Sequence, residues 1–277
     1  MELPDIQDSH DDRGIAIDEV GVANVRSPFN FRDGEISQSG VATVAVTVGL
    51  HREARGTHMS RMVQSIESIL ADLVPNELGA HLKNLAALLH AHDVRLSVEF
   101  PVALAVQAPA TRIVSHQVSD VVLSASLHEE VVRLATSVTT DITTLCPCSQ
   151  AVSDYGAHNQ RSRVSVDVMG RGDDLYPMSV VDLFGLIRSV GSAPVVPVIK
   201  RADERHLTMQ AFDRPAFVED VVRDLSAALR QGSIPHRVES VNVESIHSHD
   251  AVARLAWPGG HNLKVDGARR SAAIIPT

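Results

Sequence analysis

The chain has 277 residues, 44% of them hydrophobic, and a formal net charge of −9. This composition supports a substantial core and argues against disorder of the chain as a whole. The negative charge excludes the global positive field that holds nucleic acids by counterion release. No run approaches the roughly 20 apolar residues that span a bilayer, and the acidic start, 1–12, lacks the features of a signal peptide. We therefore expect a cytoplasmic protein without nucleic-acid or membrane partners.

In the first half of the chain, hydrophobic spacing predicts two helices between long strands. Residues 41–50 alternate β-branched and small side chains, as in a strand with one buried face. Residues 58–73 and 77–90 place apolar side chains at helical spacing, and Pro75 separates them. The strands expected to follow are 94–105 and 111–124.

The second half shows a comparable order of elements. The Gly/Asp-rich stretch 170–174 lacks the Lys-Ser/Thr ending of a nucleotide-binding loop, so we interpret it as a turn. Long β-runs with paired helices favour an antiparallel sheet covered on one face. The sequence therefore predicts an α+β fold with two similar halves. The strands expected in the second half are 131–145, 162–168, 238–246 and 251–257, and the helices are 180–189 and 216–231.

The two cysteines of the chain, Cys146 and Cys148, flank Pro147. This spacing is too tight for an unstrained disulfide. Proline favours an extended backbone, in which residues two apart point to the same side, so both thiols would face one pocket. A cysteine, His158 and a carboxylate from elsewhere would make a three-ligand metal site with a position left for water. Because a lone C-x-C pattern is weakly specific, ordinary strand-end and loop residues remain the alternative.

A second polar segment, ESIHSHD at 244–250, contains Glu244, His247 and His249. The two histidines would share a face of an extended backbone, and paired imidazoles suit proton transfer or metal binding near neutral pH. The alternative is a solvated loop, since the chain has 14 histidines.

Charged residues elsewhere in the chain could serve a binding site or could be ordinary solvated residues. Glu219 lies near the start of a predicted helix, where the helix dipole favours a carboxylate. Taken alone, it reads as an ordinary first-turn acid. A local cluster of cations could hold a triphosphate or could be a solvated face. The cationic residues concerned are Arg161, Arg163, Lys200, Arg201 and Arg205.

Six segments match the motifs of one enzyme family in their order along the chain. They are GTHMSR at 56–61, CPCS at 146–149, HNQRS at 158–162, KRADE at 200–204, FVEDVVRD at 217–224 and ESIHSHDAVA at 244–253. Together with DIQ at 5–7 and IAIDEVGV at 15–22, they resemble the type IB GTP cyclohydrolase I family. The resemblance covers nearly the whole chain.

This resemblance implies tandem tunnelling-fold modules, each an antiparallel sheet with two helices on one face. We expect an N-terminal module with an extension at 1–126 and a second module at 127–277 that carries most of the active site. It also implies a homotetramer with active sites between subunits. The implied reaction converts GTP and water to 7,8-dihydroneopterin 3′-triphosphate and formate, the first step of tetrahydrofolate biosynthesis.

The resemblance further implies roles for particular residues. One divalent metal, Zn²⁺, Mn²⁺ or Fe(II), would be bound by Cys146, His158 and Glu204. Glu219 would anchor the guanine edge. The remaining substrate-binding residues would be His249, Lys200, Arg201 and Arg161, and the catalytic residues Cys148, His247, Glu244 and His58. Which cysteine binds the metal, and whether His247 or His249 donates the proton, stay open.

Two other functions compete with this prediction. One is a related tunnelling-fold enzyme, such as a cyclohydrolase that forms a cyclic phosphate or a nitrile reductase with a cysteine nucleophile. The other is a noncatalytic nucleotide-binding oligomer, which would be protected by GTP against unfolding without releasing formate.

Overall fold

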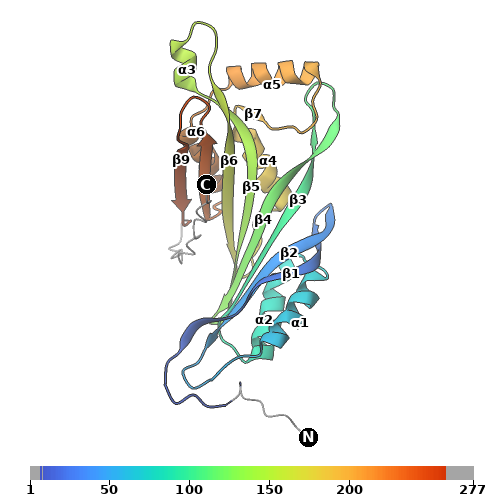
Figure 1. Cartoon of the computed structure of the whole chain (residues 1–277), viewed down its shortest axis with the longest axis vertical. Helices are drawn as coiled ribbons and strands as arrows, with labels where there is room; N and C mark the ends of the chain where they lie inside the picture. Colours follow the sequence, from blue (N-terminus) through green and yellow to red (C-terminus); the bar gives the residue numbers. More distant parts are fainter. Residues whose placement is uncertain (1–6, 8, 260–277) are drawn as a thin grey trace.

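The computed structural model of the chain describes residue 7 and residues 9–259. Within these residues, nine antiparallel strands form one sheet in the order β1-β2-β3-β4-β5-β6-β8-β9, with short β7 paired to β5 (Figure 1). The strands are β1 Ile17–Asp33, β2 Ile36–Leu50, β3 Val94–Gln107, β4 Val114–His128, β5 Val131–Leu145, β6 Asn159–Arg171, β7 Ala193–Pro194, β8 His236–Val243 and β9 Ala251–Trp257. The helices are α1 Met59–Leu70, the 3-10 turn η1 Pro75–Glu77, α2 Leu78–Leu89, α3 Pro147–Val152, α4 Val180–Val190, α5 Arg201–Asp213 and α6 Val218–Gln231.

The element order repeats. Two strands, two helices and two strands (β1, β2, α1, α2, β3, β4) are followed by a second set of the same kind (β5, β6, α4, α6, β8, β9). Helices α1 and α2 cover the first half of the sheet, and α4 and α6 cover the second (Figure 1). The predicted α+β class with two similar halves is therefore confirmed.

The two halves share one sheet, because β4 pairs with β5 across the middle of the chain. The hairpin between these strands is only Glu129–Glu130, and both residues have positive φ, at 46° and 64°. Two successive left-handed residues match the right-handed twist of the flanking strands. The division at 126/127 falls just before this hairpin and stays a prediction.

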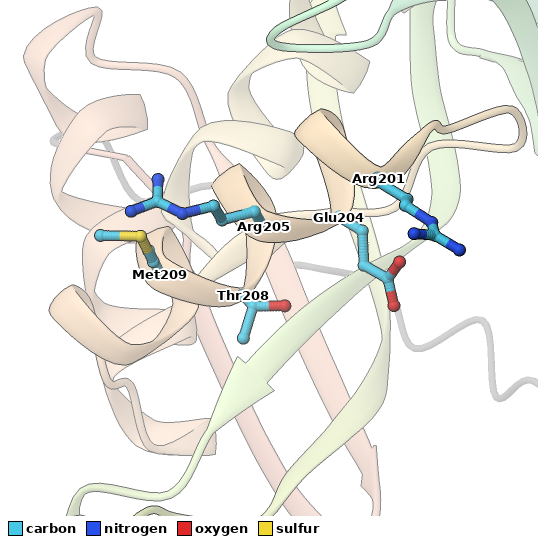
Figure 2. A pocket seen from close by; sticks show the side chains of 5 residues that line it. All are labelled: Arg201, Glu204, Arg205, Thr208 and Met209. Atoms are coloured by element: carbon cyan, nitrogen blue, oxygen red, sulfur yellow. The ribbon is translucent and has the colours of Figure 1, made fainter.

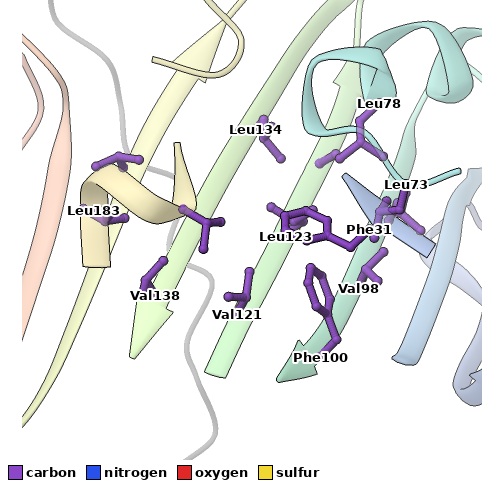
Figure 3. Close-up of a cluster of buried hydrophobic side chains, with 14 of the residues drawn as sticks. Phe31, Leu73, Leu78, Val98, Phe100, Val121, Leu123, Leu134, Val138 and Leu183 are labelled. Carbon is purple, nitrogen blue, oxygen red and sulfur yellow. The ribbon is translucent and has the colours of Figure 1, made fainter. Parts of the chain in front are cut away.

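Alternation along the strands produces the core. Strand β3, for example, buries every second residue from Val94 to Val106. Because pairing keeps Val121 opposite Val138 and Leu123 opposite Thr136, the buried faces of β4 and β5 coincide. Figure 3 shows the resulting core, which runs from Phe31 in β1 across the sheet to Leu183 in α4. Both helix pairs therefore cover the same face.

A buried contact joins the two halves besides the sheet. The hydroxyl of Tyr176 donates to Asp33 Oδ2 at 2.8 Å, and the Val180 amide donates to the same oxygen at 2.8 Å. Asp33 ends β1, whereas Val180 begins α4. The first strand of the chain thus caps a helix of the second half.

Most predicted elements lie within a few residues of the observed ones, and 131–145 and 251–257 agree at both ends. The turn at 170–174 is confirmed: β6 ends at Arg171, and Gly172 has a φ of 60°. The expected strand 238–246 ends at Val243 instead, because the chain bends away afterwards. The sequence prediction missed β1, α3, β7 and α5.

Among the described residues, no helix is long and apolar enough to cross a membrane. Most of the acidic start falls outside these residues, including Asp5 and Ile6 of the DIQ segment.

Candidate active site

Strand pairing brings Cys146 and His158 together. Leu145 is paired with Asn159 at the end of β5 and the start of β6, so the next residue on each side lies just beyond the ladder. The Cys146 amide donates to the His158 carbonyl at 3.1 Å, and the His158 amide donates to Ser149 Oγ at 3.2 Å. The predicted thiol and imidazole ligands are therefore held at one end of the sheet by backbone hydrogen bonds.

The expected extended backbone through Cys146, Pro147 and Cys148 is wrong. Pro147 is the first residue of α3, and Cys146 is its N-cap, with Sγ accepting from the Ser149 amide at 3.4 Å. Proline suits the first helical position because its fixed φ is helical and the missing N–H would have no helical partner. Cys148 is consequently carried into the helix, where it is exposed, whereas Cys146 is half-buried. The argument for two thiols on one side no longer holds.

Three further predicted residues gather beside His158. Glu244 follows β8, and its Oε2 lies 3.8 Å from His158 Nδ1, with both side chains about nine-tenths buried. The rings of His158 and His247 are 6.5 Å apart and perpendicular, and His249 stacks on His247 at 5.1 Å. The rings of His247 and His249 do lie face to face, although the segment is a bend and not the extended backbone that the prediction assumed. One end of β5, β6 and β8 thus collects a thiol, three imidazoles and a carboxylate.

A chain of buried polar side chains lies beneath His158. Gln160 Oε1 faces His158 Nδ1 at 2.9 Å, and Gln160 Nε2 donates to Thr144 Oγ1 at 3.0 Å. Thr144 and Ser162 hydroxyls are 2.8 Å apart, and Ser162 donates to Asn242 Oδ1 at 2.6 Å. None of these four residues was predicted from the sequence. Gln160 and Ser162 share the alternation of the buried valines of β6, and a polar residue in a buried phase is the signal that could have revealed them.

Glu204 lies on α5, which crosses the same end of the sheet (Figure 1). Its side chain lines an open cavity of about 460 Å³ with Arg201, Arg205, Thr208 and Met209 (Figure 2). Lys200, also exposed, precedes the helix. The predicted carboxylate and cations therefore occur on one exposed helix face.

Asp203, the neighbour of Glu204, is fully buried and holds α5 to the tip of the β3–β4 hairpin. It accepts hydrogen bonds from the amides of Ala110, Thr111 and Lys200 and from the Thr111 hydroxyl, at 2.7–3.0 Å. Burial alone would raise the pKa of Asp203, but these bonds hold it well below its usual range. Asp203 was not predicted from the sequence, because a position near the N-terminus of a helix does not by itself distinguish a buried acid from a solvated one.

Glu219 lies in the first turn of α6, as predicted, and is exposed. The loop before α6 is tied to the end of β5, because the Ala216 amide donates to the Leu145 carbonyl at 3.0 Å. Arg161 is mostly exposed, with Nη1 3.8 Å from Asp141 Oδ2. Arg163 is engaged more closely, with Nη2 2.5 Å from Asp120.

Not all of the predicted site residues are brought together in the described part of the chain. Across residue 7 and residues 9–259, no three His, Cys, Asp or Glu side chains converge closely enough to hold a metal ion. His58, which precedes α1, is also not brought to this end, because α1 and α3 lie toward opposite ends of the long axis (Figure 1). The structure therefore joins Cys146, His158, Glu244, His247 and His249, but joins neither Glu204 nor His58 to them.

Two repeats of strands and helices, with both helix pairs on one face of a continuous antiparallel sheet, define the class as tandem tunnelling-fold proteins. Residues 3–253 match the family described as type I GTP cyclohydrolase folE2. The chain therefore belongs to the type I GTP cyclohydrolase folE2 family, and the resemblance inferred from its motifs is confirmed.

Curated relatives agree with this family. GTP cyclohydrolase FolE2 of Bordetella avium is 38% identical over 255 residues, covering 91% of this chain and 95% of the relative. GTP cyclohydrolase FolE2 1 of Dechloromonas aromatica is 39% identical over 260 residues, with the same coverage of both chains. Among solved structures, a hyper-thermostable AgUricase mutant is similar over 90% of this chain and 94% of that chain, with 9% identity and a TM-score of 0.48.

Proposed function

We propose that this protein is a GTP cyclohydrolase that converts GTP and water to 7,8-dihydroneopterin 3′-triphosphate and formate, supplying tetrahydrofolate biosynthesis. The family match over residues 3–253 carries the proposal, because this range includes every residue assigned to the site. Relatives named GTP cyclohydrolase FolE2 that align over 91% of the chain support it. We assign the protein to the cytoplasm.

The donor set fits a divalent metal ion. Cys146 offers a thiolate and His158 an imidazole, and both ligand types suit Zn²⁺, Fe(II) and related ions. Gln160 engages His158 Nδ1, which leaves Nε2 for a ligand. Glu204 is the proposed third ligand. The metal would supply Lewis acidity that makes water a usable nucleophile at C8 of the guanine near neutral pH.

A second group of predicted residues would bind and orient the substrate. The Glu219 carboxylate accepts hydrogen bonds from guanine N1 and the exocyclic amine, a pattern that adenine does not present. His249 adds a contact to the substrate. The triphosphate would pair with the two arginines that line the cavity on α5, Arg201 and Arg205. We add Lys200, which precedes α5, and Arg161 of β6 as further cations for it.

Proton transfer falls to the group beside His158. Glu244 and His247 lie close enough to His158 to exchange protons with a substrate held there. Cys148 and His58 complete the proposed catalytic set. Because α1 lies toward the other end of the molecule, His58 would act in the site of a second subunit.

The separation of Glu204 and His58 from Cys146 and His158 supports a homotetramer with sites between subunits. Glu204 faces an open cavity on α5, and a neighbouring subunit could bring Cys146 and His158 to it. Light scattering on the purified protein tests whether it is a tetramer. A monomer that retains full turnover would exclude shared sites.

The decisive experiment incubates metal-reconstituted protein with GTP under anaerobic conditions, with each divalent metal in turn. We expect formate together with a product that gives neopterin fluorescence after oxidation and dephosphorylation. Formate with a cyclic phosphate product would identify the related enzyme instead. GTP protection against unfolding without formate would identify the noncatalytic oligomer.

A further inference from the structure

We infer that Gln160, Thr144, Ser162 and Asn242 form a hydrogen-bond relay that fixes the tautomer of His158, with the hydrogen on Nδ1 and the lone pair on Nε2. The four residues come from β5, β6 and β8, and none exposes more than 6% of its surface. They touch neither the cavity on α5 nor its cations. We therefore regard them as positioning residues.

The direction of the relay follows from what each group can donate. The carbonyl oxygen of Asn242 can only accept, so the single hydroxyl hydrogen of Ser162 is used there, at 2.6 Å. Thr144, 2.8 Å from Ser162 Oγ, must then donate to Ser162. Its own oxygen is left to accept from Gln160 Nε2, at 3.0 Å.

The last link is the imidazole itself. With Nε2 of Gln160 turned to Thr144, Oε1 faces His158 Nδ1 at 2.9 Å and can only accept, so Nδ1 carries the hydrogen. Glu244 Oε2 competes for the same hydrogen, but at 3.8 Å it is beyond hydrogen-bond range. The lone pair on Nε2 is thus presented away from the relay.

If the side-chain amide of Gln160 or Asn242 were turned over, every hydrogen bond of the relay would have to reverse its direction for all of them to be kept. If Gln160 turned its Nε2 to His158, Nδ1 would have to accept, and the lone pair would leave Nε2. Because burial makes each unpaired polar group costly, mixed arrangements are disfavoured. The relay therefore acts as a unit, and a distant member such as Thr144 acts on His158 through Gln160.

The test reads the tautomer directly in metal-free protein. Solid-state ¹⁵N spectra of protein labelled at histidine nitrogens distinguish a protonated from an unprotonated ring nitrogen, and His158→Gln identifies the signal. We expect a protonated Nδ1 and a bare Nε2 in the wild type and in Gln160→Glu, which keeps the acceptor. Gln160→Leu and Thr144→Val should give the other tautomer or a mixture. Thr136→Val is the matched control, since Thr136 is equally buried on the same face of β5.

A second readout is Zn²⁺ affinity, measured by chelator competition, and it rests on the proposed function. Gln160→Leu and Thr144→Val should weaken binding about 10–100-fold, while Gln160→Glu and Thr136→Val stay near the wild type. An unchanged tautomer in Gln160→Leu overturns the relay, as does an equal loss of affinity in Thr136→Val. If the wild type binds no Zn²⁺ but the tautomers follow the expected series, the relay stands and the proposed metal site fails.

Discussion

Glu219 is the residue on which base selection should depend most directly. Its carboxylate is exposed in the first turn of α6, so it is free to accept two hydrogen bonds from guanine. Glu219→Ala should weaken GTP binding about 10–100-fold, because hydrogen bonds to a charged group contribute roughly 1.5–3 kcal/mol. Isothermal titration with GTP, alongside metal analysis, checks this.

Cys146→Ala is the matched comparison for Glu219→Ala. It should lose metal and turnover together, whereas Glu219→Ala keeps its metal. Retention of GTP affinity by Glu219→Ala would remove this residue from the guanine subsite.

His236 makes stability depend on pH at a position away from the site. It is fully buried, with Nδ1 donating to the Ile234 carbonyl at 2.7 Å and Nε2 2.8 Å from Ser226 Oγ. Burial lowers the pKa of His236 below 6.5; the bond to Ile234 opposes this shift and Arg230 adds to it. At pH values between the lowered native pKa of His236 and its unfolded pKa of about 6.5, the unfolded chain binds more protons than the folded chain. The contribution of the neutral, buried imidazole to the free energy of unfolding is therefore complete above about pH 6.5 and is lost as the pH falls through the native pKa.

The measurement is urea unfolding at pH 7.5 and 5.5 at one protein concentration. The wild type should lose more stability between these pH values than His236→Gln, whose side chain does not titrate. Equal losses in the two proteins would show that the pKa of His236 is the same in the folded and unfolded states.

Only part of the site could be predicted at the residue scale. Motif order identified Cys146, His158, Glu244 and His247, which strand pairing then brought together. The relay escaped prediction because its members come from three strands, and only the register reveals that Thr144, Ser162 and Asn242 meet. Pro147 was misjudged because proline suits a helix start as well as an extended chain.

At the scale of elements, the N-terminus of α5 depends on Asp203. Asp203→Ala should lower the melting temperature by several degrees and increase hydrogen exchange in the β3–β4 hairpin and α5, because it leaves the amides of Ala110 and Thr111 without their acceptor. Asp203→Asn should have a smaller effect. Asp213→Asn, at the exposed end of the same helix, is the control and should change little.

If Asp203→Ala and Asp213→Asn exchange alike in the hairpin, the contact does not hold α5. The melting temperature alone would not separate this outcome from general destabilisation, so exchange at residues 108–112 is the deciding observation.

Two long elements lacked a readable signal. In β1, the register shifts between Ile17 and Val20 and again between Val22 and Val25, and Asn24 has a φ of 57°, so alternation is regular only near its end. In α5, only Asp203 and Ala211 are buried, so the helix has no apolar stripe. Elements that bury a regular face, such as β3 and α6, were predicted because burial imposes the period.

The whole molecule should unfold as one unit despite its repeated halves. A single core spans both helix pairs, β4 pairs with β5, and Asp33 reaches Tyr176 and Val180 in the other half. Trp257, the one tryptophan of the chain, reports on the second half, and hydrogen exchange in α1 and α2 reports on the first. We expect the two midpoints in urea to coincide.

Separate midpoints would mean that the halves are independent despite the shared sheet. Tyr176→Phe, which removes the hydroxyl bound to Asp33, should shift both probes together if the molecule is cooperative.

The hairpin at Glu129–Glu130 has a further consequence for protein engineering. Its backbone suits asparagine and glycine better than two adjacent glutamates, which also repel each other. The amino acids of this hairpin between the two halves are therefore not the ones that would make it most rigid. An Asn-Gly replacement there should make the scaffold more heat-tolerant, and it would do so far from the chemistry, at a loop where tags or reporter domains could also be inserted.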